Sequence, residues 1–122
     1  MQAVLADVET NYRHAEELME QAMEGNPDIL VLPETWNTGF YISRKLKSIA
    51  DEGGKRTEAF LSSFAKKYHV NVVGGSAAVL YGNDVYNRSF VFDREGRKTA
   101  DYDKVHGFSY AHEPMYFKGG DH

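Results

Sequence analysis

The stretch DILVLPETWNTGFY, residues 28–41, decides how this chain folds. Its apolar run, residues 29–32, lies between Pro27 and Pro33. A short, continuously apolar run of this kind is typical of a strand buried on both faces, in a sheet that helices cover. Glu34 comes next after Pro33. Ligand sites in open α/β sheets form beyond the carboxyl ends of strands, so this carboxylate is the first candidate for chemistry.

The segments before and after this strand in the sequence both have apolar residues at helical spacing. Upstream, Asp7 can cap a helix whose apolar positions recur every three or four residues. Those positions are Val8, Tyr12, Ala15, Leu18, Met19 and Ala22. Downstream, a polar connection over residues 37–56, with a short helix near 43–50, leads to a second helix from Thr57. The inner face of that helix is expected to carry Phe60, Phe64, Ala65 and Tyr68.

Extended segments make up the rest of the regular structure. Residues 70–80 favour extended chain, interrupted by Gly74-Gly75. Residues 85–92 and 97–102 are predicted to pair as a hairpin through the tight turn between them. The order of elements predicts one α/β domain over residues 1–122, with a mixed sheet covered by helices on one side.

The composition narrows the possible functions. The formal net charge is −4 and the basic residues form no stripe, which argues against nucleic acid as a partner. No apolar run reaches the roughly 18–20 residues that span a bilayer, and no signal peptide follows Met1. A cytoplasmic protein without a membrane partner is therefore expected. The chain has no cysteine, which excludes disulfides, thiolate metal sites and a thiol nucleophile among its own residues.

Glu34 has a functional and an inert interpretation. Trp36, Phe40 and Tyr41 follow it closely and would partly desolvate the carboxylate, which suits a general base. The alternative is a solvated glutamate in a strand-to-loop turn, with no chemical role. The residues by themselves leave both interpretations open.

Lys104 also follows a predicted strand. An ammonium group in a closed site can stabilise an oxyanion. The alternative is a surface lysine that balances Asp101 and Asp103. Glu113, nine positions further on, carries no signal of its own.

Two other groups of residues are weaker candidates. His106, His112 and His122 lie near Glu113 and Asp121, but their spacing fits neither a helical histidine pair nor a zinc finger, so no metal is expected. The segment 74–76, Gly-Gly-Ser, is too short for a phosphate-binding loop. It is expected to let the backbone pass close to a neighbouring strand or loop.

At these residues the chain resembles the nitrilase, or carbon–nitrogen hydrolase, superfamily. ILVLPETWNTGFY (residues 29–41) is similar to the strand-and-glutamate motif of the family. NRSFVFDREGRKTADYDKVHGF (87–108) is similar to its hairpin and lysine motif, and HEPMYFKGGD (112–121) to the loop that brings a supporting glutamate. The residues of these motifs most resemble those of the amidase branch that contains ω-amidase-like enzymes. Such enzymes act on small amides of dicarboxylic or keto acids.

The resemblance implies an α-β-β-α sandwich and cofactor-free hydrolysis of a C–N bond. Glu34 would be the general base, Lys104 the catalytic lysine and Glu113 the supporting glutamate. Phe40 and Phe108 would line the substrate pocket. In the family a cysteine thiolate attacks the substrate, and the lysine steadies the developing negative charge.

The missing cysteine limits what this chain is expected to do. The resemblance covers only the front half of a family member, both ends look cut, and the nucleophile would lie downstream. Loss of a nucleophile costs about a millionfold in turnover in a comparable hydrolase, so the chain alone should be inactive. Two alternatives are an interaction partner, oligomeric through an exposed sheet face, and a binding module that keeps the pocket without chemistry.

Overall fold

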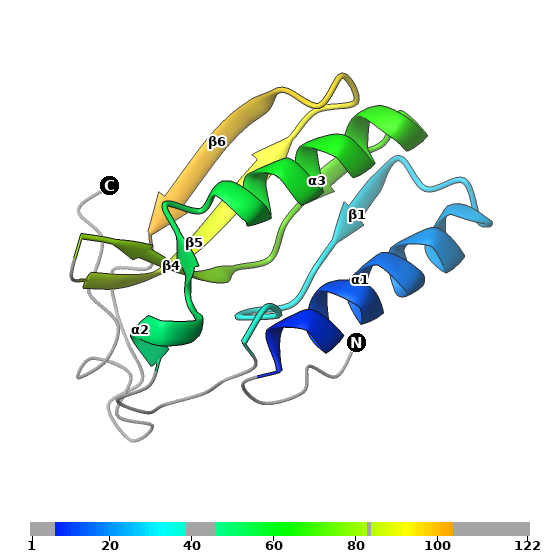
Figure 1. Ribbon diagram of the computed structural model, residues 1–122. Helices are drawn as coiled ribbons and strands as arrows, with labels where there is room; N and C mark the ends of the chain where they lie inside the picture. Colours follow the sequence, from blue (N-terminus) through cyan, green and yellow to red (C-terminus); the bar gives the residue numbers. More distant parts are fainter. Residues whose placement is uncertain (1–6, 39–45, 83, 104–122) are drawn as a thin grey trace.

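The computed structural model describes residues 7–38, 46–82 and 84–103, which form one twisted sheet packed against two long helices (Figure 1). The elements are α1 (Val8–Met23), β1 (Ile29–Val31), α2 (Leu46–Ile49), β2 (Asp51–Glu52), α3 (Lys55–Tyr68), β3 (Asn71–Val73), β4 (Ala77–Tyr81), β5 (Asp84–Phe92) and β6 (Lys98–Asp103). The predicted α/β class is confirmed. The strand β2 was not predicted, and α3 begins two residues before the predicted start.

The sheet is mixed, as the sequence predicts. Strand β1 pairs with β3 and β2 pairs with β4, both in parallel, while β5 runs antiparallel to β3, β4 and β6. The predicted hairpin is the pair β5 and β6, with Ser89 opposite Tyr102. Strands β3 and β4 lie one after the other along the same edge of β5, because Val73 is opposite Val91 and Ala77 is opposite Arg88.

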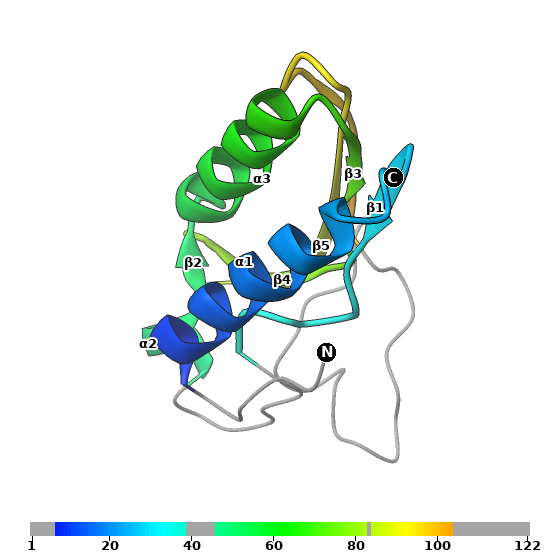
Figure 2. The ribbon, with the colours of Figure 1, turned by 90° about the vertical axis from the view of Figure 1, so that its right-hand side faces the viewer.

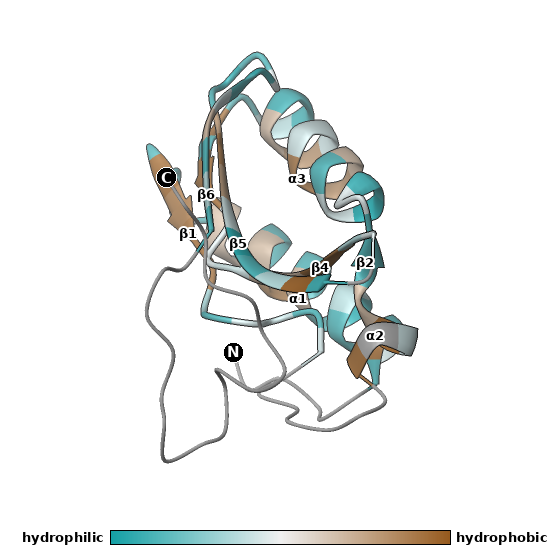
Figure 3. Cartoon of the chain, turned by 90° about the vertical axis from the view of Figure 1, so that its left-hand side faces the viewer, coloured by the Kyte–Doolittle hydropathy of each residue, from teal (hydrophilic) through white to brown (hydrophobic). Residues whose placement is uncertain are grey.

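Helices α1 and α3 lie side by side on one face of the sheet (Figures 2 and 3). Asp7 caps α1 through a hydrogen bond of 3.2 Å from the backbone N–H of Thr10, as the sequence predicts. The core beneath the helices contains Tyr12, Ala15, Met19, Leu30, Leu32, Trp36, Leu61, Phe64, Ala65, Val70, Val72, Ala77, Val79, Phe90 and Phe92. Leu61 was not among the predicted inward residues of α3, whereas Phe60 and Tyr68 are only partly buried. Among the described residues no helix is long and apolar enough to cross a membrane.

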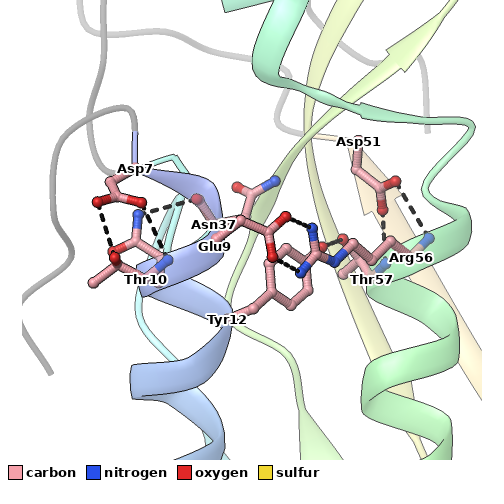
Figure 4. A network of polar contacts seen from close by, with 9 residues as sticks. Asp7, Glu9, Thr10, Tyr12, Asn37, Asp51, Arg56 and Thr57 are labelled. Carbon is pink, nitrogen blue, oxygen red and sulfur yellow. Dashed lines mark hydrogen bonds and ion pairs between the residues drawn. The ribbon is translucent and has the colours of Figure 1, made fainter.

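A polar network joins the two helices above this core (Figure 4). The guanidinium of Arg56 on α3 binds both carboxylate oxygens of Glu9 on α1, at 2.6 and 2.9 Å. It also lies 3.9 Å from the centre of the Tyr12 ring, whose hydroxyl is 2.8 Å from the Thr57 hydroxyl. Asp51 of β2 accepts hydrogen bonds from the first backbone N–H groups of α3 and so replaces a side-chain cap there.

The described residues cover the opposite face of the sheet only in part. The short helix α2 packs Leu46 against Ala78 and Val85 at one end of this face. At the other end Ile29 and Val31 of β1 are 53% and 70% exposed. The prediction of a strand buried on both faces is therefore wrong for the described chain, because α1 and α3 cover one face of β1 only.

Candidate functional site

Glu34 lies in the loop that follows β1, at the carboxyl end of that strand, as predicted. Its side chain is exposed. Trp36 does not shield it: the indole is fully buried, with its ring 4.9 Å from that of Tyr12 and 5.6 Å from that of Phe60 in the core under the helices. The expected desolvation of Glu34 by Trp36 is therefore wrong, because this ring packs into the helix-covered core.

The Glu34 loop is fixed by the segment between β3 and β4. Val73 is paired with Val91, and Ala77 is paired with Arg88. Between these two pairs, the three residues 74–76 therefore lie opposite only two residues of β5, 89 and 90. The extra residue makes a β-bulge, which bends a strand and redirects its polar groups. Bulges are common next to active sites, and this one lies directly beside Glu34.

Ser76, in the bulge, holds the backbone on both sides of Glu34. Its N–H donates to the carbonyl of Pro33 at 3.2 Å, and its carbonyl accepts from the N–H of Trp36 at 3.1 Å. Its hydroxyl oxygen accepts from the N–H of Thr35 at 2.9 Å. The indole N–H of Trp36 donates to the carbonyl of Gly74 at 2.8 Å, so the loop is anchored at each of the residues that flank Glu34.

Gly75 allows this close approach. A Cβ atom at this position would fall well inside contact distance of the carbonyl oxygens of Leu32 and Pro33, and Gly75 has a φ of +58°. Any other residue would push the bulge away from the loop. The sequence-based expectation that Gly74 and Gly75 let the backbone pass close to a neighbouring loop is confirmed.

Thr35 has a strained backbone. Its φ is +46°, in the left-handed region that β-branched residues rarely adopt. Such a conformation costs on the order of 1–3 kcal/mol and persists where the surroundings enforce it, most often at functional sites. Here the hydrogen bond to Ser76 and complete burial of Thr35 enforce it.

Asn37 fixes the far end of the loop. Its side-chain amide donates to the carbonyl of Ala78 at 3.0 Å, and its oxygen accepts from the N–H of Ala78 at 2.9 Å. The amide thus pairs with the edge of β4 as another strand would. Its own carbonyl accepts from the side chain of Asn11 on α1 at 3.0 Å, which links the loop to the helix layer.

Asn87 of β5 contacts the Glu34 side chain directly. Its amide nitrogen donates to Oε1 of Glu34 at 2.7 Å. Sequence reasoning missed Asn87, although it lies within one of the quoted motifs. The available signal was a polar side chain in the middle of a strand whose neighbours Val85, Phe90 and Phe92 are apolar.

Glu34 and Asn87 line one hollow on the partly covered face of the sheet. Its volume is about 320 Å³ and its lining residues are Glu34, Gly75, Ser76, Asn87, Ser89 and Tyr102. Hydroxyl and amide groups surround a single carboxylate there. Such a set can hold and release a proton and can hydrogen-bond a small polar substrate.

The end of β6 is also fixed by side chains. Arg88 binds both carboxylate oxygens of Asp103, at 2.6 and 2.7 Å, and the ion pair is largely buried. This hydrogen bond raises the pKa of Arg88 above its usual value. Arg88 also donates to the hydroxyl of Tyr81 at 2.6 Å. The ion pair therefore fixes the position of Asp103, the residue that precedes Lys104 in the sequence.

The other predicted site residues lie outside the described part of the chain. These are Lys104, Glu113, Phe40 and Phe108, together with the weaker metal candidates His106, His112, His122 and Asp121. Of the predicted catalytic set, the structure describes Glu34 alone. Within residues 7–38, 46–82 and 84–103, no group of acidic or histidine side chains could hold a metal ion.

Comparison with known proteins identifies relatives along the whole chain. The family model described as carbon-nitrogen hydrolase matches residues 1–122. The 2-oxoglutaramate amidase of Bacillus subtilis (strain 168) is 38% identical over 110 residues, which are 90% of this chain and 42% of that enzyme. The chloroplastic omega-amidase of Arabidopsis thaliana is 31% identical over 111 residues, 87% of this chain and 30% of that protein.

Solved structures show the same relation. Nit3 of Saccharomyces cerevisiae, a member of branch 10 of the nitrilase superfamily, has a TM-score of 0.83 and 28% identity, over 99% of this chain and 46% of Nit3. A carbon-nitrogen hydrolase of Helicobacter pylori G27 has a TM-score of 0.84 at 23% identity, over 98% of this chain and 43% of that one, and shows the shared fold. The chain spans less than half the length of these relatives. It belongs to the carbon–nitrogen hydrolase family, over the amino-terminal part of the family domain.

Proposed function

We propose that this chain supplies the carboxylate part of the active site of an ω-amidase-type carbon–nitrogen hydrolase, which a cysteine-bearing segment completes. The single observation that carries the proposal is Glu34, held by Ser76 and Asn87 at the end of β1. The relatives named 2-oxoglutaramate amidase and omega-amidase support small keto-acid or dicarboxylic amides as the substrate class.

The chemistry requires a group that this chain does not carry. Glu34 would take the proton of a thiol, the thiolate would attack the amide carbon, and ammonia would leave with the proton returned by Glu34. Water would then hydrolyse the thioester to the free acid and restore the thiol. Lys104 would stabilise the oxyanion, with Glu113 as the supporting carboxylate and Phe40 and Phe108 in the substrate pocket.

The partly covered sheet face supports the need for a second segment. Ile29 and Val31 are exposed at one end of this face, and Glu34 is exposed in the hollow on the same side. A segment packed on this face would bury the apolar residues and close the hollow over Glu34. Without it the chain has no nucleophile, since it contains no cysteine.

Reconstitution tests this proposal. The chain is mixed with a carboxyl-terminal segment of a full-length family member, chosen because it carries a cysteine, and ammonia release from glutaramate is measured. The chain alone should release none, and the mixture should release ammonia. The same mixture with the cysteine of the added segment replaced by alanine is the control, and equal ammonia release by the control would contradict the proposed mechanism.

A second candidate is a non-catalytic partner that associates through the same face. The exposed fractions of Ile29 and Val31 favour it, because isolated apolar sheet faces tend to bind other chains. Light scattering after size exclusion would show a dimer or larger species that Val31→Lys dissociates. A monomer for the unmodified chain would exclude self-association through this face. The expected cytoplasmic location also stays a proposal, for cell fractionation to test.

A further inference from the structure

We propose that Asn87 is a positioning residue for the carboxylate of Glu34, a role that rests on the proposed function of Glu34 as the base. A glutamate side chain has several rotatable bonds, and that of Glu34 is exposed although the next residues of its loop are buried. The backbone contacts of Ser76 fix where the side chain starts but not where its carboxylate points. The hydrogen bond from Asn87 to Oε1 supplies the second fixed point.

Asn87 is itself held rigidly. It is 2% exposed and lies in the middle of the nine-residue strand β5. Its pairing partner on β4 is Ala78, the same residue whose N–H and C=O both bind the Asn37 side chain. Asn37 and Asn87 therefore lie on opposite sides of Ala78, the first bound to its backbone and the second opposite it in the pairing of β4 with β5. Both the Glu34 loop and the strand that carries Asn87 are thus joined to β4.

The chemistry of an amide suits this position. An asparagine N–H₂ donates a hydrogen bond to a carboxylate but does not exchange protons with it at neutral pH. A lysine would instead hold the carboxylate in an ion pair, and an aspartate would repel it. Asn87 can thus orient Glu34 while leaving proton transfer to the glutamate and the substrate-bound groups.

Kinetics of the protein completed with its cysteine-bearing segment test this role. Asn87→Asp replaces the donor by a carboxylate that repels Glu34, and Asn87→Ser shortens the side chain and so removes the hydrogen bond without adding a charge. Both should lower kcat for glutaramate about 10- to 100-fold, the effect of losing one hydrogen bond to a charged group, with KM changed less than about threefold. Asn71→Asp is the matched control: this asparagine, on β3 of the same sheet, binds the carbonyl of Asp28 and should keep kcat within about twofold.

The outcomes separate the two proposals. Active sites are titrated through the thiol, so that misfolded protein does not count, and Asn87→Ser carries the test if Asn87→Asp does not fold. An unchanged kcat in a folded Asn87 variant would overturn the positioning role. The role would also be overturned if the variant had fewer titratable active sites but each remaining site kept the wild-type kcat. Wild-type activity of Glu34→Gln in the same assay would instead overturn the proposed function itself.

Discussion

The hydroxyl oxygen of Ser76 accepts a hydrogen bond of 2.9 Å from the backbone N–H of Thr35, and both residues are buried. Through this bond the bulge between β3 and β4 holds the residue after Glu34 in the left-handed backbone region. The position of the backbone that carries the candidate catalytic carboxylate therefore depends on a segment about forty residues away in the chain. Substitutions in the bulge should affect stability and the site together.

Ser76→Ala should destabilise the fold. The change leaves the buried N–H of Thr35 without its acceptor, at a cost of about 1–3 kcal/mol. Urea unfolding monitored by tryptophan fluorescence measures it, because the single Trp36 lies in the same loop. Ser63→Ala, on the exposed side of α3, is the control and should change stability by less than about 0.5 kcal/mol. Equal effects of the two substitutions would contradict a specific role of Ser76.

Gly75→Ala and Gly82→Ala separate backbone strain from steric contact. Both glycines have a positive φ, +58° and +61°, so alanine strains the backbone similarly at each. Only at Gly75 does a Cβ meet other backbone atoms, whereas nothing lies within 4 Å at Gly82. Gly82→Ala should cost about 1 kcal/mol, and Gly75→Ala clearly more. Similar melting temperatures for the two variants would disprove the close contact.

The buried ion pair between Arg88 and Asp103 should be far more sensitive than an exposed one. Asp103→Asn leaves a largely buried guanidinium without its carboxylate, which typically costs 3–5 kcal/mol. The exposed pair between Arg94 and Asp28 is the comparison, and Asp28→Asn should cost less than about 1 kcal/mol. Chemical denaturation of both variants measures the loss of unfolding free energy. A small loss for Asp103→Asn would contradict the prediction and would mean that water reaches Arg88.

The raised pKa of the buried Tyr12 hydroxyl predicts that the protein loses stability at alkaline pH. Burial raises the pKa of its hydroxyl from 10.0 to about 12, so the folded state keeps a proton that the unfolded chain loses. The resulting stability is fully present below pH 10 and is lost as the pH rises towards and through about 12, by at most about 2–3 kcal/mol. Tyr12→Phe removes this group, and its unfolding free energy should fall less than that of the wild type between pH 9 and 11. Parallel pH dependences would contradict this assignment.

Local patterns predicted the elements well, and tertiary contacts explain the failures. Asp7 and the apolar spacing of α1 gave its start and its buried face, since both depend on residues within one helix. The apolar run of β1 could not show that Ile29 and Val31 are exposed, because burial depends on what covers each face of the sheet. Strand β2 was missed because its two acidic residues have no strand preference of their own, and their strand forms by pairing with β4, far along the sequence.

The candidate site likewise has one part that a local pattern predicts and another that depends on tertiary contacts. Glu34 was predicted, because a carboxylate directly after an apolar strand is visible in one short segment. Asn87 was not, because its contact with Glu34 joins residues 53 positions apart. The bulge that positions the loop depends on a mismatch of one residue between two pairings, and only the structure reveals such a mismatch.

We propose Glu34 as the base of a carbon–nitrogen hydrolase site. Ammonia release from glutaramate by Glu34→Gln, in the chain mixed with a cysteine-bearing segment of a family member, measures this directly. Glu17→Gln, an exposed glutamate on α1, is the matched control. We predict a loss of about 10²- to 10⁴-fold for Glu34→Gln, as expected for removal of a general base, and wild-type rates for Glu17→Gln. Equal rates for the two variants would contradict the claim.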